Sequence, residues 1–202
     1  MCIAAFVSQA NATVYYVAPS GDGDGTSWNS PFGSIKTAYD KSDASEVRVK
    51  TGTYSFESIT LKSGVHLLGG YTGNADERVS DPALTVWNGG ASSVNRFITA
   101  PSANPLSTRT TVSGFTFQNN TSTANGGAIL MRAFLTLENC IVSGNSATSG
   151  GGILINTDVA GDAIQILTCK IDHNNAATGG GGGITIGSGS DTGDVSIIIQ
   201  DS

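Results

Sequence analysis

The sequence is poor in charged and aromatic side chains. Charged residues make up 13% and aromatic residues 7% of the 202 positions, with only 3 Cys and 5 Pro. The net charge is −6 and no basic patch exists, which argues against a nucleic-acid partner. No run approaches the ~20 apolar residues of a membrane-spanning helix, so we expect no transmembrane segment in this fragment. The Ala-, Leu-, Glu- and Lys-rich stretches of helical bundles are also missing.

Glycine and alternating apolar residues are what the sequence has instead. There are 27 Gly, and 39% of the residues are hydrophobic. Three segments share a strand pattern, an Asn and a Gly-rich block that ends in Ile: Thr110–Ile129, Leu135–Ile153 and Ile164–Ile184. A fourth copy opens at Val195. Within each copy the apolar residues alternate, which indicates strands with one buried face. A repeat of roughly 25–30 residues buries its apolar face only by stacking on further copies, so the sequence predicts an all-β, parallel β-helix.

The N-terminal part lacks this repeat and has a helical segment. Residues 34–40 predict a short amphipathic helix with Ile35, Ala38 and Tyr39 on one side. The first coil of a solenoid has an apolar end that must be covered, so we expect this helix to be an N-terminal cap. Strand candidates in this part are residues 14–18, 46–50, 58–61, 65–68, 85–87 and 96–99.

No Pro/Ser-rich linker divides the chain. We therefore interpret residues 13–202 as one domain, with the cap and first coils in 13–109 and the clear repeats in 110–202. The fourth copy stops at Ser202, so we expect the sequence to be truncated at its C-terminus.

Residues 1–12 look like the remnant of a secretory signal peptide. Ala10-Asn11-Ala12 fits the small-x-small cleavage rule, with Thr13 as the mature start. The basic n-region is missing and the apolar run is short, so we expect the true start to lie upstream. An ordinary apolar N-terminus is the alternative interpretation.

Two sets of equivalent repeat positions predict structural roles. We expect the asparagines at one turn to stack as a hydrogen-bonded amide ladder: Asn120, Asn145 and Asn174. Cys140 and Cys169 are also equivalent and should be neighbours across coils. Phe115 holds that position in the first copy, which indicates an apolar interior site. Two buried thiols or a disulfide remain open as interpretations.

Several segments resemble secreted bacterial right-handed β-helix proteins of the pectate-lyase-like superfold. The resemblance is carried by residues 16–32, 47–54 and 64–71, which read YVAPSGDGDGTSWNSPF, VRVKTGTY and GVHLLGGY. It implies a right-handed coil.

The repeats resemble those of chlamydial polymorphic outer-membrane proteins, whose signatures are Phe-x-x-Asn and Gly-Gly-Ala-Ile. Residues 117–120 and 126–129 fit both signatures, whereas Val142 and Ile171 replace the Phe in later copies and Gly replaces the Ala. Together the two resemblances cover about residues 14–202. They imply a secreted protein, or one displayed on the cell surface or outer membrane of a bacterium, often adhesin-like.

Catalytic candidates are weak. A polysaccharide lyase of this superfold needs a base and usually Ca²⁺ held by carboxylates, and a glycoside hydrolase needs paired carboxylates at a defined separation. Lys170 and Asp172 could point outward from one strand, with His173 beside them. An ordinary solvated face is the simpler interpretation of this pair.

Two aspartate-containing loops are the candidates for Ca²⁺ binding in this sequence. Asp22 and Asp24 alternate with glycines in a tight loop, and Asp191 and Asp194 lie in a loop similar to a calcium-binding nonapeptide repeat. Plain Gly/Asp turns are the default interpretation of both loops. We therefore expect no metal site, with Ca²⁺ as the alternative.

Three functional hypotheses follow. The first is a non-catalytic, adhesin-like β-helix that binds a polysaccharide or a host or cell-surface protein. The second is a polysaccharide lyase or glycoside hydrolase with its site partly in coils beyond residue 202. The third is a passive structural spacer. Trp28 and Trp87, the only tryptophans, are expected to pack near the cap rather than to form a sugar platform.

Overall fold

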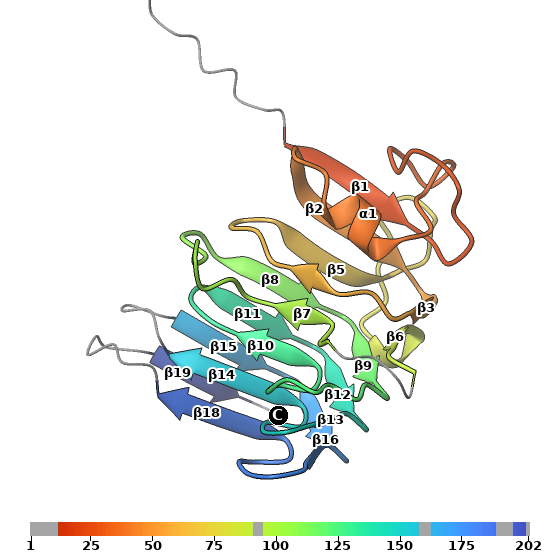
Figure 1. Cartoon of the computed structure of the whole chain (residues 1–202). Coiled ribbons are helices and arrows are strands. Elements are labelled where there is room, and N and C mark those ends of the chain that lie inside the picture. Colours follow the sequence, from red (N-terminus) through yellow and green to blue (C-terminus); the bar gives the residue numbers. More distant parts are fainter. Residues whose placement is uncertain (1–11, 91–94, 158–162, 189–195, 201–202) are drawn as a thin grey trace, which may run out of the picture.

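The protein folds into parallel β-sheets with almost no helix (Figure 1). The computed structural model describes residues 12–90, 95–157, 163–188 and 196–200. Every pairing between its named strands is parallel. The predicted all-β class is therefore confirmed.

Three large sheets contain most of the strands. The first sheet has the order β1 (Thr13–Val17), β2 (Ala44–Lys50), β5 (His66–Tyr71), β8 (Thr110–Ser113), β11 (Leu135–Glu138), β15 (Ala163–Leu167) and β19 (Ser196–Gln200). The second has β3 (Gly52–Ser55), β6 (Thr85–Asn88), β9 (Thr116–Gln118), β12 (Ile141–Ser143) and β16 (Lys170–Asp172). The third has β4 (Ile59–Thr60), β7 (Ile98–Thr99), β10 (Ile129–Met131), β14 (Ile153–Thr157) and β18 (Ile184–Ser188). A two-stranded sheet joins β13 (Ser146–Ala147) to β17 (Asn175–Ala176).

From β2 onward, and apart from β13 and β17, successive strands of the chain belong to the first, second and third large sheets in turn, and we call one such round a passage. Each strand pairs with the strand of the same sheet in the next passage, as the repeat predicts. Leu137 of β11, for example, pairs with Val112 of β8 on one side and with Ile166 of β15 on the other. All three side chains are buried. Burying one such aliphatic side chain contributes about 1.5–3 kcal/mol, so the stacked inward rows provide the core.

Aromatic side chains fill the core between β6 and β9. Trp87 is fully buried, with its ring centroid 5.5 Å from Phe97 and 5.8 Å from Phe117. Its indole Nε1 donates a hydrogen bond of 3.1 Å to the Ser55 carbonyl oxygen. The polar atom of this large side chain is thus satisfied, and Trp87 is a core residue.

The one described α-helix lies between β1 and β2 in the chain and contacts both strands. It is α1 (Ile35–Tyr39), and its Ser34 N-cap accepts a 2.9 Å hydrogen bond from the Thr37 amide. Ile35, Ala38 and Tyr39 are buried as predicted. A short 3₁₀ helix, η1 (Pro82–Leu84), precedes β6.

Three strands and one strand register differ from the expectations. Residues 52–55 form β3, and the short strands β13 and β17 follow the repeat asparagines; none of the three was among the expected strands. Ile164 pairs with Ile197 rather than with Val195, and Val195 lies outside the described residues. A shift of two residues keeps the same face inward, so alternation alone cannot distinguish the two registers.

The C-terminal end of the stack exposes apolar side chains. Ile186 is 56% exposed, Ile198 41% and Ile199 49%. They lie on β18 and β19, the last strands of the third and first sheets. The other large apolar side chain exposed in the described part is Leu84, at 47%.

Candidate functional site

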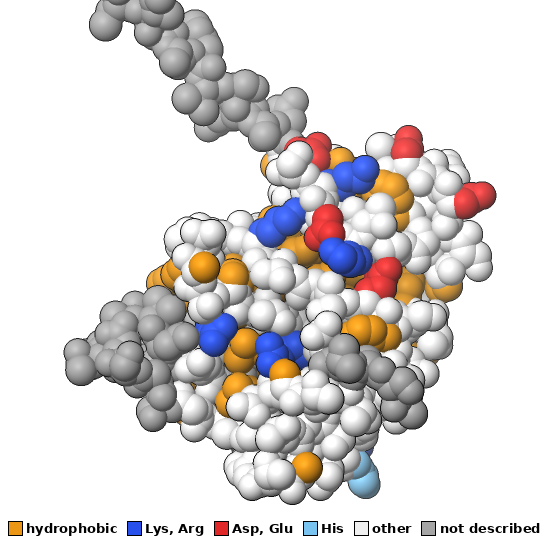
Figure 2. All heavy atoms as spheres, viewed as in Figure 1, with side chains coloured by type: hydrophobic (Ala, Val, Ile, Leu, Met, Phe, Trp, Pro, Cys, Tyr) orange, Lys and Arg blue, Asp and Glu red, His pale blue; other side chains and the backbone are white. Residues whose placement is uncertain are grey.

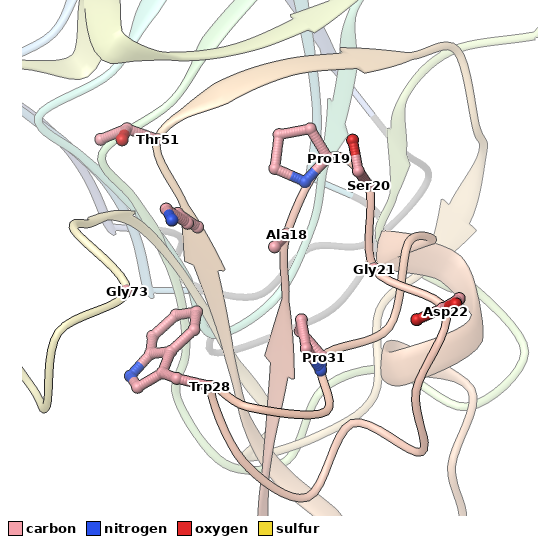
Figure 3. Close-up of a pocket in the computed structure, with 10 residues that line it drawn as sticks. Ala18, Pro19, Ser20, Gly21, Asp22, Trp28, Pro31, Thr51 and Gly73 are labelled. Atoms are coloured by element: carbon pink, nitrogen blue, oxygen red, sulfur yellow. The ribbon is translucent and has the colours of Figure 1, made fainter.

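A hollow of about 440 Å³ opens beside the first strands of the protein (Figure 3). Its wall comes from the loop that follows β1, the end of β2 and the loop that follows β5. The lining includes Pro19, Asp22, Trp28, Lys50, Thr51 and Gly73. Pro31 lies between Trp28 and Asp22 in Figure 3. Aromatic, cationic and acidic groups are thereby gathered in one place.

The loop after β1 is a hydrogen-bonded wall. The Gly23 amide donates to the Pro31 carbonyl at 2.9 Å, and the Gly25 amide donates to the Ser30 carbonyl at 2.7 Å. A Cβ at Gly21 would lie 2.4 Å from the Pro31 oxygen. The loop segments that contain Gly21 and Pro31 can therefore approach this closely only because residue 21 is glycine. The Gly-Asp-Gly-Asp-Gly sequence therefore shapes the wall of the hollow.

Trp28 is held rigidly at the edge of the hollow. Its ring lies edge-on to Tyr16, with centroids 4.8 Å apart, and 5.7 Å from Tyr71. Its indole Nε1 donates a hydrogen bond to the Ala75 carbonyl oxygen. The indole is half-buried and lines the cavity. A ligand that stacks on this ring would restrict little additional side-chain freedom.

Lys50 brings a cation into the hollow from the last position of β2. Its stem runs against Gly73, where a Cβ would lie 2.9 Å from both Cδ and Cε of the lysine. Gly73 has a φ of 86°, which also favours glycine. In the part of the chain that the structure describes, Lys50 Nζ has neither an ion pair nor a hydrogen bond to a side chain.

The nearby carboxylates are engaged by another cation. Arg48 forms ion pairs with both Glu46 and Asp76. Its guanidinium also lies over two aromatic rings, 5.8 Å from the centroid of Tyr16 and 5.5 Å from that of Tyr71. This network lies against the two tyrosines that contact Trp28.

Lys170 and Asp172 form an ion pair on β16 in which the Asp172 side chain is 25% exposed. Lys170 Nζ lies 2.8 Å from Asp172 Oδ2, and His173 Nδ1 lies 3.2 Å from the same oxygen. The Lys170 and His173 side chains are 69% and 82% exposed. The hydrogen bond from Lys170 lowers the pKa of Asp172 well below its usual range, with a further contribution from Ser143. The arrangement holds Asp172 as a carboxylate on the outer surface.

Of the aspartates considered for Ca²⁺, the structure describes Asp22 and Asp24. Asp24 Oδ1 accepts hydrogen bonds from the Thr26 amide (3.0 Å) and hydroxyl (2.8 Å), which lower the pKa of Asp24. In the described part of the chain, Asp22 is the only acidic residue that lines the hollow. Asp191 and Asp194 lie outside the described residues. Within the described ranges there is no group of three or more His, Cys, Asp or Glu side chains that could hold a metal ion.

The repeat asparagines are stacked and hydrogen-bonded. The Asn120 amide N–H donates to Asn145 Oδ1 at 3.1 Å, and the Asn145 amide N–H donates to Asn174 Oδ1 at 2.9 Å. Asn145 Nδ2 also donates to Asn174 Oδ1, at 3.0 Å. These bonds join successive passages of the chain at one corner, so the ladder is a structural device.

Cys140 and Cys169 occupy equivalent buried positions as free thiols. The Lys170 amide donates to the Cys140 carbonyl at 2.9 Å, and the Ile141 amide donates to the Phe115 carbonyl at 2.8 Å. Phe115, Cys140 and Cys169 therefore occupy the same register position in successive passages of the chain. Burial raises the pKa of the Cys140 thiol, which keeps it protonated.

The hollow beside Trp28 was missed by sequence reasoning, although Trp28 and the Gly-Asp-Gly-Asp-Gly loop were both noted.

No helix in the described part of the chain is long and apolar enough to cross a membrane. Comparisons with protein-family models, curated proteins and solved structures found no match.

Proposed function

We propose that the chain is a right-handed parallel β-helix, secreted or displayed on the surface or outer membrane of a bacterium. The ordered passage through three parallel sheets supports this fold. Parallel strands are joined by right-handed crossovers in nearly all proteins. Between β1 and β2 the described chain forms α1 instead of strands of the other two sheets, which supports a capping role for this helix. The resemblance to chlamydial outer-membrane repeats supports the location.

We further propose that the protein is a non-catalytic, adhesin-like module that binds a glycan in the hollow beside Trp28. The observation that carries this proposal is the half-buried indole, fixed by Tyr16 and Ala75 at the edge of a 440 Å³ hollow. Ligand sites typically combine such a volume with an apolar wall and a few polar groups. An aromatic face suits the C–H face of a sugar, while Asp22 and Thr51 can bond its hydroxyls.

A polysaccharide lyase or hydrolase is the second candidate, favoured by the cluster of Lys170, Asp172 and His173. A surface protein as partner and a passive spacer are further alternatives. The test is to incubate the full chain with acidic and neutral polysaccharides, with and without Ca²⁺. Retained binding and newly formed unsaturated or reducing ends are recorded together.

Three variants make this test specific to the hollow. Trp28→Ala is expected to reduce glycan binding at least tenfold, and Trp28→Phe to retain part of it. Leu84→Ala removes an exposed apolar side chain elsewhere and should leave binding unchanged. Product formation would overturn the non-catalytic proposal. If no glycan is retained by the wild-type chain, the glycan-binding proposal is wrong.

A further inference from the structure

The charge distribution in the hollow points to the kind of sugar it takes. Among the described residues that line it, Lys50 is the only basic one. The Lys50 side chain is half-buried and lines the hollow together with Trp28, and Arg48 engages the carboxylates of Glu46 and Asp76. A cation that has no ion-pair partner among the described residues gains most from an anionic group that arrives with the ligand.

We propose that the hollow binds a sugar acid, meaning a sugar ring that carries a carboxylate. This inference rests on the proposed glycan-binding function and names the ligand class of the same site. The carboxylate pairs with Lys50 Nζ, the ring lies against Trp28, and hydroxyls donate to the Asp22 carboxylate. A volume of about 440 Å³ accommodates one or two sugar rings rather than a long chain.

Gly73 has a positioning role in this site. It has no side chain, so the stem of Lys50 passes over its backbone and reaches the cavity. A methyl group at residue 73 would meet Cδ and Cε of Lys50 at 2.9 Å and would also be strained at a φ of 86°. Gly73→Ala is therefore expected to displace the ammonium and to weaken binding of the acid form selectively.

Two ligands that differ only at one carbon test the proposal. Methyl β-glucuronide carries a carboxylate where methyl β-glucoside carries a CH₂OH group. Binding of each to the full chain is followed by ligand-observed NMR titration and by the change in tryptophan fluorescence. The glucuronide is expected to bind about tenfold or more tightly, because bonds to a charged group contribute more than neutral ones. Raising the salt concentration should reduce this difference.

Variants separate the charge from the aromatic contact. Lys50→Met should remove the preference for the glucuronide while leaving glucoside binding within about twofold, and Lys50→Arg should restore much of the preference. Trp28→Ala should weaken both ligands. Lys36→Met, on the exposed side of α1, is the matched charge control and should change neither. Thermal unfolding of each variant shows whether it is folded.

The outcomes distinguish the two proposals. Equal binding of both ligands, or a preference that survives Lys50→Met, would overturn the sugar-acid inference while the glycan-binding function stands. Binding of methyl glucoside 6-sulfate as tightly as the glucuronide would show a general anion site and would also overturn it. If neither these ligands nor any glycan of the panel binds, the proposed function itself fails.

Discussion

Removing the central side chain of the asparagine ladder should be among the most costly single changes in this protein. Asn145 is 1% exposed. Its Oδ1 accepts from the Asn120 amide at 3.1 Å. Its Nδ2 donates to the Phe117 carbonyl and to Asn174 Oδ1, each at 3.0 Å, and to the Ser143 carbonyl at 3.1 Å. Asn145→Ala deletes all four bonds and leaves their partners without this side chain.

The magnitude follows from the burial of those partners. A net hydrogen bond contributes about 1 kcal/mol, and a buried group left unpaired costs about 1–3 kcal/mol. Asn145→Ala is therefore expected to lower the free energy of unfolding by about 3–5 kcal/mol. Asn174 is only half-buried, so water can replace part of the hydrogen bonds that its side chain makes. Asn174→Ala should therefore lower the free energy of unfolding by only about 1–2 kcal/mol.

Urea unfolding of the full chain, followed by far-UV circular dichroism, measures these differences. Asn104→Ala, at an exposed asparagine, is the matched control and should stay within about 0.5 kcal/mol of the wild type. A loss below about 1 kcal/mol for Asn145→Ala would refute the reasoning, because the ladder bonds would then contribute no net stability. A change of the denaturant dependence without a change of midpoint would also contradict it.

Three further expectations test the core and the outer surface. Cys140 and Cys169 should react slowly with a thiol reagent in the native state and rapidly in urea, measured in a Cys2→Ser background; the absence of both thiols in urea would show a disulfide. Trp87→Ala should lower the free energy of unfolding by about 3–5 kcal/mol, because the ring is fully buried, and a loss under 1 kcal/mol in urea titrations would contradict its core position. The pKa of Asp172 is lowered by Lys170, so the stability from this pair is present above about pH 4 and is lost as the pH falls. Asp172→Asn should flatten the acid side of the pH–stability curve and cost under about 1 kcal/mol at pH 7; an unchanged acid slope would refute this.

The repeat predicted which strands pair because stacking enforces one register on successive copies. Ile129 pairs with Ile153, which pairs with Ile184, as the aligned Gly-rich blocks indicate. At the last strand the alignment was wrong by two residues, because Ile197 rather than Val195 pairs with Ile164. A two-residue slip leaves every inward side chain inward, so hydrophobicity does not oppose it.

The hollow could not be predicted in the same way because no periodic signal marks it. It requires Lys50 at the end of β2, Gly73 in the loop after β5 and Trp28 in the loop after β1 to meet. Each of these residues reads as an ordinary loop or strand-end residue in the sequence. The packing of Trp28 against Tyr16 and Tyr71, together with its hydrogen bond to the Ala75 carbonyl, holds the indole at the edge of the cavity.

The division between repeat and non-repeat segments explains where a binding site can arise. Each inward position of a repeat contacts the passages before and after it, so a change there disturbs three layers at once. Basic residues are correspondingly rare after Thr110, where only Arg132 and Lys170 occur, and on the face in Figure 2 the acidic side chains lie at the N-terminal end. The loop after β1 stacks on no equivalent copy among the described residues. It can therefore carry charge and an aromatic side chain without disturbing the register of the strands, as loops on a rigid scaffold commonly do.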